Sequence, residues 1–350
     1  MKRTLTLAVA LLALAGIALF AGRVETASAT QERPMGSLVG TGASFPFPLI
    51  SKWIPAVDQA YGINITYSPT GSSAGIAGIT GRTVDFGASD APLSPDQITA
   101  CKGCVVVPWG LAGTSIPYNI PGIGQRLRLT GPVLAQIYLG EITNWNAAAI
   151  RAINPGRNLP DLKITPVYRS DGSGTTYNFT DYLSAVSPAW KSKVGVGTTV
   201  NYPTGIGARG SSGVAGVLKS TAGALTYVDT AYSLSNKFTF AAIRNATGTF
   251  TLPGLRNVKA AVSTLPKKIT SLKQIKIVDP PKSAGRQAYP ISTFTYVIAA
   301  TSSGSKAADL RKFIYWAVTR GQAFGPPLLF QPMPTSVQAF AFREIKKIQQ

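Results

Sequence analysis

Hydrophobic residues along the chain follow two patterns that alternate. Short runs rich in apolar residues predict β-strands at 63–67, 84–88, 164–167 and 291–300. Apolar residues at helical spacing predict helices over 49–57, 130–139, 212–219 and 307–319. Because strands and helices alternate through most of the chain, we expect an α/β protein.

Four of the predicted strand–helix junctions share glycine and hydroxyl residues. They are GTGASFP at 40–46, GSSAG at 71–75, FGASD at 86–90 and RSDGSGTT at 169–176. In open α/β sheets, ligands bind where the carboxyl ends of strands face a crevice. Each junction alone is also typical of an ordinary helix cap, and Ser44 is expected to cap the helix that follows it. Four junctions of one chemical character favour a binding site for a compact oxyanion.

The junction at 169–176 carries several kinds of donor for an oxyanion. Arg169 places a forked positive charge just before the turn. Gly172 and Gly174 allow the backbone to approach a ligand closely. Hydroxyl groups follow on Ser173, Thr175 and Thr176. The first turn of the predicted helix adds unpaired N–H groups and a favourable dipole.

The charge balance of the chain excludes several classes of function. The 350 residues include 34 Lys or Arg, 14 Asp or Glu and no His, for a net charge of +20. A chain of this length predicts two domains. Without His, the chain has neither a His-assisted Ser or Cys nucleophile nor a His metal site. We therefore expect no metal site and no cofactor.

Residues 1–29 are typical of a secretory signal peptide. Lys2 and Arg3 precede an apolar stretch at 5–21, and the small residues Ala27-Ser28-Ala29 predict cleavage after Ala29. An uncleaved anchor is the alternative, which the small residues disfavour. Removal of this segment takes away three bases and one acid, leaving a net charge of +18. We expect an exported, periplasmic protein.

Cys101 and Cys104 are the only cysteines of the chain. In an exported protein, this spacing favours a small disulfide loop. A zinc site would need two further Cys or His ligands, which the sequence lacks. A redox motif should open a helix, whereas Val105-Val106-Val107-Pro108 predicts a strand.

Two other motifs are incomplete. Gly71-x-Ser73-x-Gly75 matches the nucleophile elbow of hydrolases, but no His completes a triad. The G-x-G-x-x-G pattern at 205–210 has Asp229 about 20 residues further on, as in dinucleotide-binding proteins. However, the preceding residues 201–204 predict a poor strand. The chain has no phosphate-binding P-loop motif.

Eight stretches together resemble the phosphate-binding proteins of bacterial high-affinity phosphate ABC transporters (Pst type). They are GTGASFP at 40–46, GSSAG at 71–75, TVDFGASDAPLS at 83–94, NIPG at 119–122, IYLGEITNW at 137–145, RSDGSGTTYNFTDYL at 169–183, GIGARGSSGVAG at 205–216 and YPISTFTYV at 289–297. The resemblance covers nearly the whole chain after the signal segment. The basic segment at 255–288, Pro55 and the cysteine pair are not motifs of this family.

The resemblance implies a two-lobed periplasmic-binding-protein fold of type II, with a mixed sheet and flanking helices in each lobe. We expect lobe one at 36–115 plus 290–350 and lobe two at 116–289. The implied phosphate ligands are Ser44, Phe45 (backbone), Ser72, Asp90, Arg169, Ser173, Gly174 (backbone) and Thr175. The implied partners are inorganic phosphate and the permease and ATPase subunits of the transporter, with no nucleic acid. The protein is expected to be a monomer and not an enzyme.

Asp90 is the residue expected to set selectivity. An ionised carboxylate only accepts hydrogen bonds, so it needs a ligand that carries a proton. Phosphate carries one near neutral pH and sulfate does not. Against sulfate, Asp90 would present an unpaired acceptor and a like charge.

Two rival functions remain on the same residues. An exported phosphatase would use Ser73 or Ser173 as nucleophile, but the chain lacks His and a metal cluster. A binder of surface polymers would use the basic surface. The few carboxylates also suggest that the protein keeps its stability in an acidic periplasm, whereas the alternatives are electrostatic steering of phosphate and a bias in composition.

Overall fold

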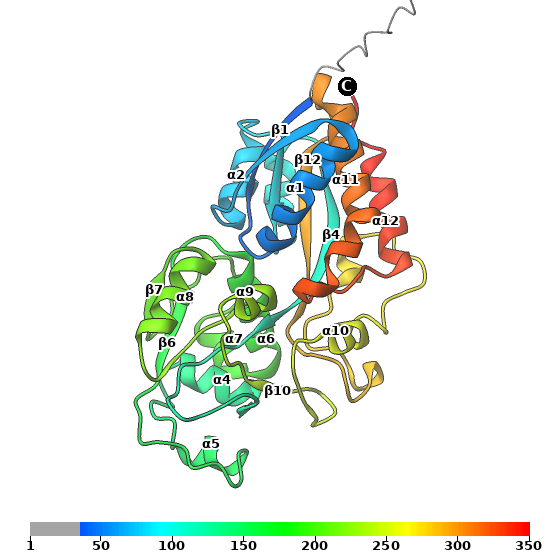
Figure 1. Ribbon diagram of the computed structural model, residues 1–350. Coiled ribbons are helices and arrows are strands. Elements are labelled where there is room, and N and C mark those ends of the chain that lie inside the picture. Colours follow the sequence, from blue (N-terminus) through cyan, green and yellow to red (C-terminus); the bar gives the residue numbers. More distant parts are fainter. Residues whose placement is uncertain (1–35) are drawn as a thin grey trace, which may run out of the picture. The chain divides into compact units, whose positions relative to one another are not determined.

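The computed structural model describes residues 36–350 (Figure 1). The predicted signal peptide at 1–29 lies outside the described residues. Among the described residues, no helix is both long and apolar enough to cross a membrane.

The first lobe is built on a six-stranded mixed sheet. Its order is β2 (Ile63–Ser68), β1 (Gly36–Gly42), β3 (Phe86–Ser89), β12 (Ser292–Ala300), β4 (Cys104–Ser115) and β9 (Val228–Asp229). The first three strands run parallel, and β12 pairs antiparallel with both β3 and β4. Its main helices are α1 (Phe47–Tyr61), α2 (Ser72–Thr80), α11 (Ala307–Val318) and α12 (Thr335–Ile345). Chain segments far apart in sequence therefore form one sheet.

A cluster of aromatic side chains fills the core of this lobe. The Trp109 ring lies 5.3 Å from Trp53, 6.2 Å from Phe86 and 6.0 Å from Phe313, measured between ring centroids. All four side chains are fully buried. Because α1, β3, β4 and α11 each contribute one ring, this cluster fixes the helices against the sheet.

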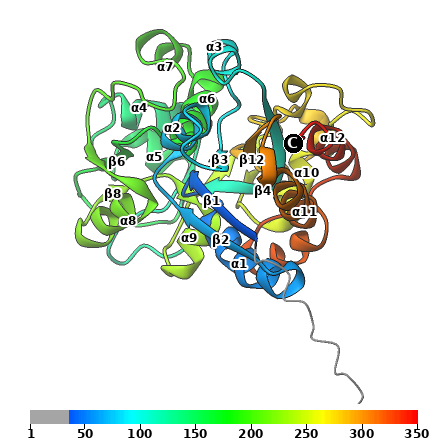
Figure 2. The same ribbon diagram turned by 90° about the horizontal axis from the view of Figure 1, so that it is seen from above.

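The second lobe contains two small sheets. One has the order β11 (Phe250–Thr251), β10 (Ala242–Arg244), β5 (Arg128–Leu129), and the other β7 (Ile206–Ala208), β6 (Thr165–Arg169), β8 (Ala224–Leu225). The first sheet is mixed and the second is parallel. Three longer helices accompany them, namely α4 (Gly131–Tyr138), α6 (Gly174–Val186) and α8 (Gly210–Ser220) (Figure 2). A separate core of buried side chains, including Tyr138, Phe179 and Tyr227, holds this part together.

The shorter helices complete the fold. They are α3 (Pro95–Ala100), α5 (Ala148–Ala152), α7 (Pro188–Lys193), α9 (Thr230–Ser235) and α10 (Leu255–Ala261). The two-lobed α/β fold class predicted from the sequence is confirmed. The exact lobe boundaries stay a prediction.

Three local expectations need comment. Ser44 is not the cap of α1, because Pro46 holds that position and no side chain caps the helix. The G-x-G-x-x-G pattern is not a turn after a strand, since its residues 206–208 themselves form β7. The run at 224–228 is divided between β8 and β9. The expected Cys101–Cys104 disulfide is present, and β4 begins at Cys104.

Candidate functional site

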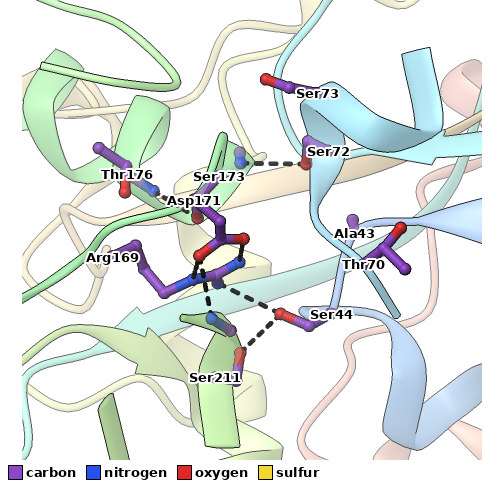
Figure 3. A network of polar contacts seen from close by, with 12 residues as sticks. Ala43, Ser44, Thr70, Ser72, Ser73, Arg169, Asp171, Ser173, Thr176 and Ser211 are labelled. Carbon is purple, nitrogen blue, oxygen red and sulfur yellow. Dashed lines mark hydrogen bonds and ion pairs between the residues drawn. The ribbon is translucent and has the colours of Figure 1, made fainter. Parts of the chain in front are cut away.

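The four glycine and hydroxyl junctions meet at one buried place between the lobes (Figure 3). Ser44 follows β1, Ser72 opens α2, Asp90 follows β3, and Arg169 ends β6. The side chains of these four residues have exposed fractions of 8%, 0%, 2% and 4%, so they are removed from bulk water. The sequence-predicted residues Ser173, Gly174 and Thr175 begin α6 and are buried as well.

Ser72 links the two lobes through its hydroxyl group. Its Oγ accepts hydrogen bonds from the Gly174 N–H at 3.0 Å and the Asp90 N–H at 3.2 Å. Nearby, the Ser73 N–H donates to the carbonyl of Gly172 at 3.0 Å. Because the Ser72 oxygen accepts both bonds, its own proton is left to donate to another acceptor.

Arg169 lies at the centre of the site and most of its fork is occupied. Nε and Nη2 donate to the two carboxylate oxygens of Asp171, at 2.6 and 2.5 Å. Nη1 donates to Ser44 Oγ at 3.2 Å. A bidentate pair of this kind fixes the plane of the guanidinium group. The site therefore holds Arg169 rigidly and with its charge largely balanced.

Asp171 and Ser211 belong to the site, although sequence reasoning missed both. Asp171 Oδ1 also accepts the Gly210 N–H at 2.9 Å, at the start of α8. Burial raises the pKa of Asp171, but the bonds and charge of Arg169 outweigh burial and hold this pKa below its usual value. Ser211 Oγ lies 2.8 Å from Ser44 Oγ. The acid two residues after Arg169 was a signal for the first, whereas nothing local in the sequence marked the second.

Phe45 contributes only its backbone to this place. Its ring is fully buried and packs edge-on against Phe330, with 6.0 Å between ring centroids. The side chain thus anchors the junction after β1 in the hydrophobic core.

Helix starts concentrate N–H groups at the site. The α2 and α6 helices both begin here, and α8 begins beside Asp171. Ser173 caps α6, because its Oγ accepts the Thr176 N–H at 3.1 Å. Helix N-termini carry partial positive charge and favour anions. The site can therefore stabilise an anion even though Asp171 balances the charge of Arg169.

Two buried polar atoms lack a hydrogen-bond partner among residues 36–350. They are Asp90 Oδ1 and Thr175 Oγ1. An unsatisfied buried polar group costs about 1–3 kcal/mol, so such atoms indicate a ligand position. A ligand that donates to Asp90 and accepts from Thr175 would satisfy both. An oxyanion that carries one proton has this combination.

Burial raises the pKa of Asp90 to about 7, although nearby hydroxyl groups and the charge of Arg169 lower it in part. Asp229, whose Oδ1 accepts the Tyr232 N–H at 2.7 Å, is buried close to Asp90. Burial, with a contribution from the charge of Asp90, raises the pKa of Asp229 to about 8. Both carboxyl groups therefore tend to hold a proton in the ligand-free fold.

These two carboxyl groups predict how the stability of the ligand-free protein depends on pH. Between about pH 4 and pH 7–8 the folded state binds protons that the unfolded state has released, so stability falls as pH rises. We expect the melting temperature to rise by several degrees from pH 8 to pH 5. The joint Asp90→Asn and Asp229→Asn variant should flatten this curve. A melting temperature that instead rises with pH over this range would contradict the prediction.

The expected acid tolerance is a separate prediction. Asp171 has a lowered pKa, so the stability that it contributes is lost only as pH falls below its usual range. We therefore expect no steep loss of melting temperature down to about pH 5. A steep loss there would leave electrostatic steering or a bias in composition as the account of the basic charge.

The two serines proposed as phosphatase nucleophiles both serve other bonds. Ser73 Oγ donates to Thr198 Oγ1 at 3.2 Å, and Ser173 Oγ accepts from the Thr176 N–H. The described residues also contain no cluster of three potential metal ligands. The geometry around these serines is that of helix starts.

Comparison with known proteins agrees with this geometry. A family model for the PBP superfamily domain matches residues 27–320. The phosphate-binding protein PstS of Xylella fastidiosa (strain 9a5c) is 38% identical over 319 residues, which cover 90% of this chain and 86% of that protein. The phosphate-binding protein PstS of Pasteurella multocida is 33% identical, covering 86% of this chain and 87% of that protein.

A solved structure supports the same fold. It is a high affinity periplasmic phosphate-binding protein (PfluDING) bound with phosphate, and it superposes with a TM-score of 0.72 at 24% identity. The match covers 88% of this chain and 93% of that one. Together, the family model and the two relatives show that the chain belongs to the PBP superfamily and, within it, to the PstS family of phosphate-binding proteins.

Proposed function

We propose that this protein binds inorganic phosphate between its lobes and delivers it to the permease and ATPase subunits of an ABC transporter. The observation that carries the proposal is the buried Asp90 Oδ1 without a partner, beside the helix starts and Arg169. An oxyanion that carries a proton fits this set of donors and one acceptor. The names of the relatives support phosphate as that oxyanion.

The proposed phosphate ligands are those expected from the sequence. Hydroxyl groups of Ser44, Ser72, Ser173 and Thr175, the Arg169 guanidinium and the N–H groups of Phe45 and Gly174 would donate to phosphate oxygens. Asp90 would accept the proton that phosphate carries. The Gly174 N–H donates to Ser72 in the structure, so it would have to be shared with, or transferred to, the ligand.

The remaining parts of the proposal concern the setting of the protein. We propose that it is exported through the segment at 1–29, works in the periplasm as a monomer and performs no catalysis. We also propose the lobe division 36–115 plus 290–350 and 116–289. The insertion of β12 between β3 and β4 supports this division, because it returns the end of the chain to the first sheet.

Titration calorimetry with phosphate, sulfate and arsenate tests the proposed function. We expect one phosphate per protein and no heat from sulfate under the same conditions, because only phosphate carries the proton that Asp90 needs. Absence of phosphate binding would overturn the proposal. Turnover of an aryl phosphate would instead support the phosphatase function.

Gly174 provides a steric test of the ligand position. A Cβ atom at this position would lie 2.6 Å from both the Asp90 nitrogen and Ser72 Oγ. Contacts this short force the junctions apart, so we expect Gly174→Ala to weaken phosphate binding by about tenfold or more. Gly216 lies in α8 with open space around it, and Gly216→Ala is the matched control. Equal affinities of the two variants in calorimetry would show that Gly174 does not shape the site.

A further inference from the structure

A second concentration of positive charge lies in the other small sheet of lobe two, on elements that contribute none of the proposed phosphate ligands. Two adjoining hollows of about 410 and 340 Å³ share Arg126, Ala242 and Phe250 as lining residues. We call them together the arginine groove. It lies along β5, β10 and β11, of which β10 is labelled in Figure 1.

The groove is lined by five arginines and by neither carboxylate nor lysine. They are Arg126, Arg128, Arg157, Arg256 and Arg286. Within residues 36–350 none of them forms an ion pair with a carboxylate. Like charges gathered in a hollow repel one another and concentrate counter-ions there. A purely solvated basic surface would have no need of a shaped depression.

Local contacts hold two of these arginines in place. Arg157 donates from Nη2 to the carbonyl of Gln125 at 2.8 Å. The Arg128 guanidinium lies 5.3 Å from the centre of the Phe250 ring. The backbone of Arg128 is paired twice with the Asn154 amide, at 2.8 and 2.9 Å. The charges are thus positioned by the fold without a carboxylate partner.

The chemistry of the groove selects for a particular anion. The planar guanidinium fork matches the oxygens of phosphate and carboxylate groups. A single phosphate group would engage one or two forks and leave the others unbalanced. Five arginines around two adjoining hollows instead match a ligand with several closely spaced charges. Condensed phosphates carry charge on every phosphate unit, whereas acidic glycans space their charges by whole sugar rings.

We propose that the arginine groove binds a chain of condensed phosphate groups, as a site separate from the cleft between the lobes. Either an inorganic chain or the polyphosphate part of a nucleotide supplies this chemistry. The half-buried Phe250 ring lies in the centre of the groove. It would contact the base or sugar of a nucleotide and contribute less to an inorganic chain.

The test is calorimetry with tripolyphosphate on protein already saturated with orthophosphate, which keeps the cleft filled. The paired variant Arg126→Gln with Arg256→Gln replaces two exposed residues, one in each hollow or shared by both. We expect it to lose tripolyphosphate affinity by about tenfold or more, since it removes two charge-assisted contacts. Orthophosphate affinity should not change.

The matched control is Lys52→Gln with Lys219→Gln, which removes the same charge from exposed positions on α1 and α8. An equal loss in both paired variants would show a general charge effect and overturn the proposal. Failure of tripolyphosphate to bind, or binding of polygalacturonate in its place, would also overturn it.

Adenosine triphosphate distinguishes the two sources of the ligand chemistry. Tighter binding than tripolyphosphate, lost in Phe250→Ala, would assign the groove to nucleotides. Equal binding of the two, unaffected by Phe250→Ala, would assign it to inorganic chains. Both results support a condensed-phosphate site, provided that affinity falls in the paired arginine variant.

Discussion

Arg169→Ala is expected to lower phosphate affinity by about 30-fold or more, the equivalent of about 2 kcal/mol. The guanidinium group is buried and donates to Ser44 while it is paired with Asp171. Its removal takes away a charge-assisted donor and leaves the Asp171 carboxylate without its counter-charge. Phosphate would then face two carboxyl groups, Asp90 and Asp171, with no cation between them. Calorimetry with phosphate measures the loss.

Two further variants separate the roles of charge and geometry at this position. Arg169→Lys keeps the positive charge but cannot form the bidentate pair with Asp171, so we expect it to recover only part of the affinity. Arg151→Ala removes an exposed arginine on α5 and is the matched control. If Arg169→Ala is folded by circular dichroism and binds phosphate as tightly as the Arg151→Ala control, Arg169 is not a phosphate ligand.

Asp90→Asn is expected to weaken phosphate binding and to relax the rejection of sulfate. An amide can turn its NH₂ group toward an oxygen that bears no proton, which a carboxylate cannot do. Sites that depend on one hydrogen bond discriminate strongly, so we expect the ratio of phosphate to sulfate affinity to fall by at least about 100-fold. Competition calorimetry with the two anions gives this ratio directly.

Asp58→Asn is the matched control for this experiment, because Asp58 lies exposed on α1 and makes the same chemical change far from the cleft. Its affinity ratio should equal that of the wild-type protein. If the Asp90→Asn ratio also stays at the wild-type value, Asp90 does not read the proton of the ligand. Selectivity would then have to come from the hydrogen-bond donors alone.

The secondary structure could be predicted well because its signals are local. The apolar residues of α11 recur at helical spacing, and the structure forms this helix over Ala307–Val318. The strong strand expected at 291–300 is β12. Periodicity failed where the tertiary structure imposed a different pairing, as at 206–208, where the glycine-rich motif joins β6 as a parallel strand.

The proposed site could be predicted in part, for a related reason. Its residues lie in short stretches that combine glycine with hydroxyl groups, and each stretch is recognisable by itself. The partners of those residues were not recognisable. Ser44 has a residue type typical of a helix cap, yet its hydroxyl contacts Ser211, which is 167 positions away in sequence. Such a contact depends on how the lobes meet, and no local pattern specifies it.

The sequence by itself determined the residue types at the cleft, the absence of histidine chemistry, the cysteine pair and the excess of positive charge. The tertiary structure decided how those charges are used. It pairs Arg169 with Asp171, leaves Asp90 buried without a partner for one oxygen, and gathers five arginines around Phe250. The physical reason is that charge and hydrogen-bonding capacity are properties of single residues. Burial, pKa and pairing are instead properties of the neighbours that the fold brings together.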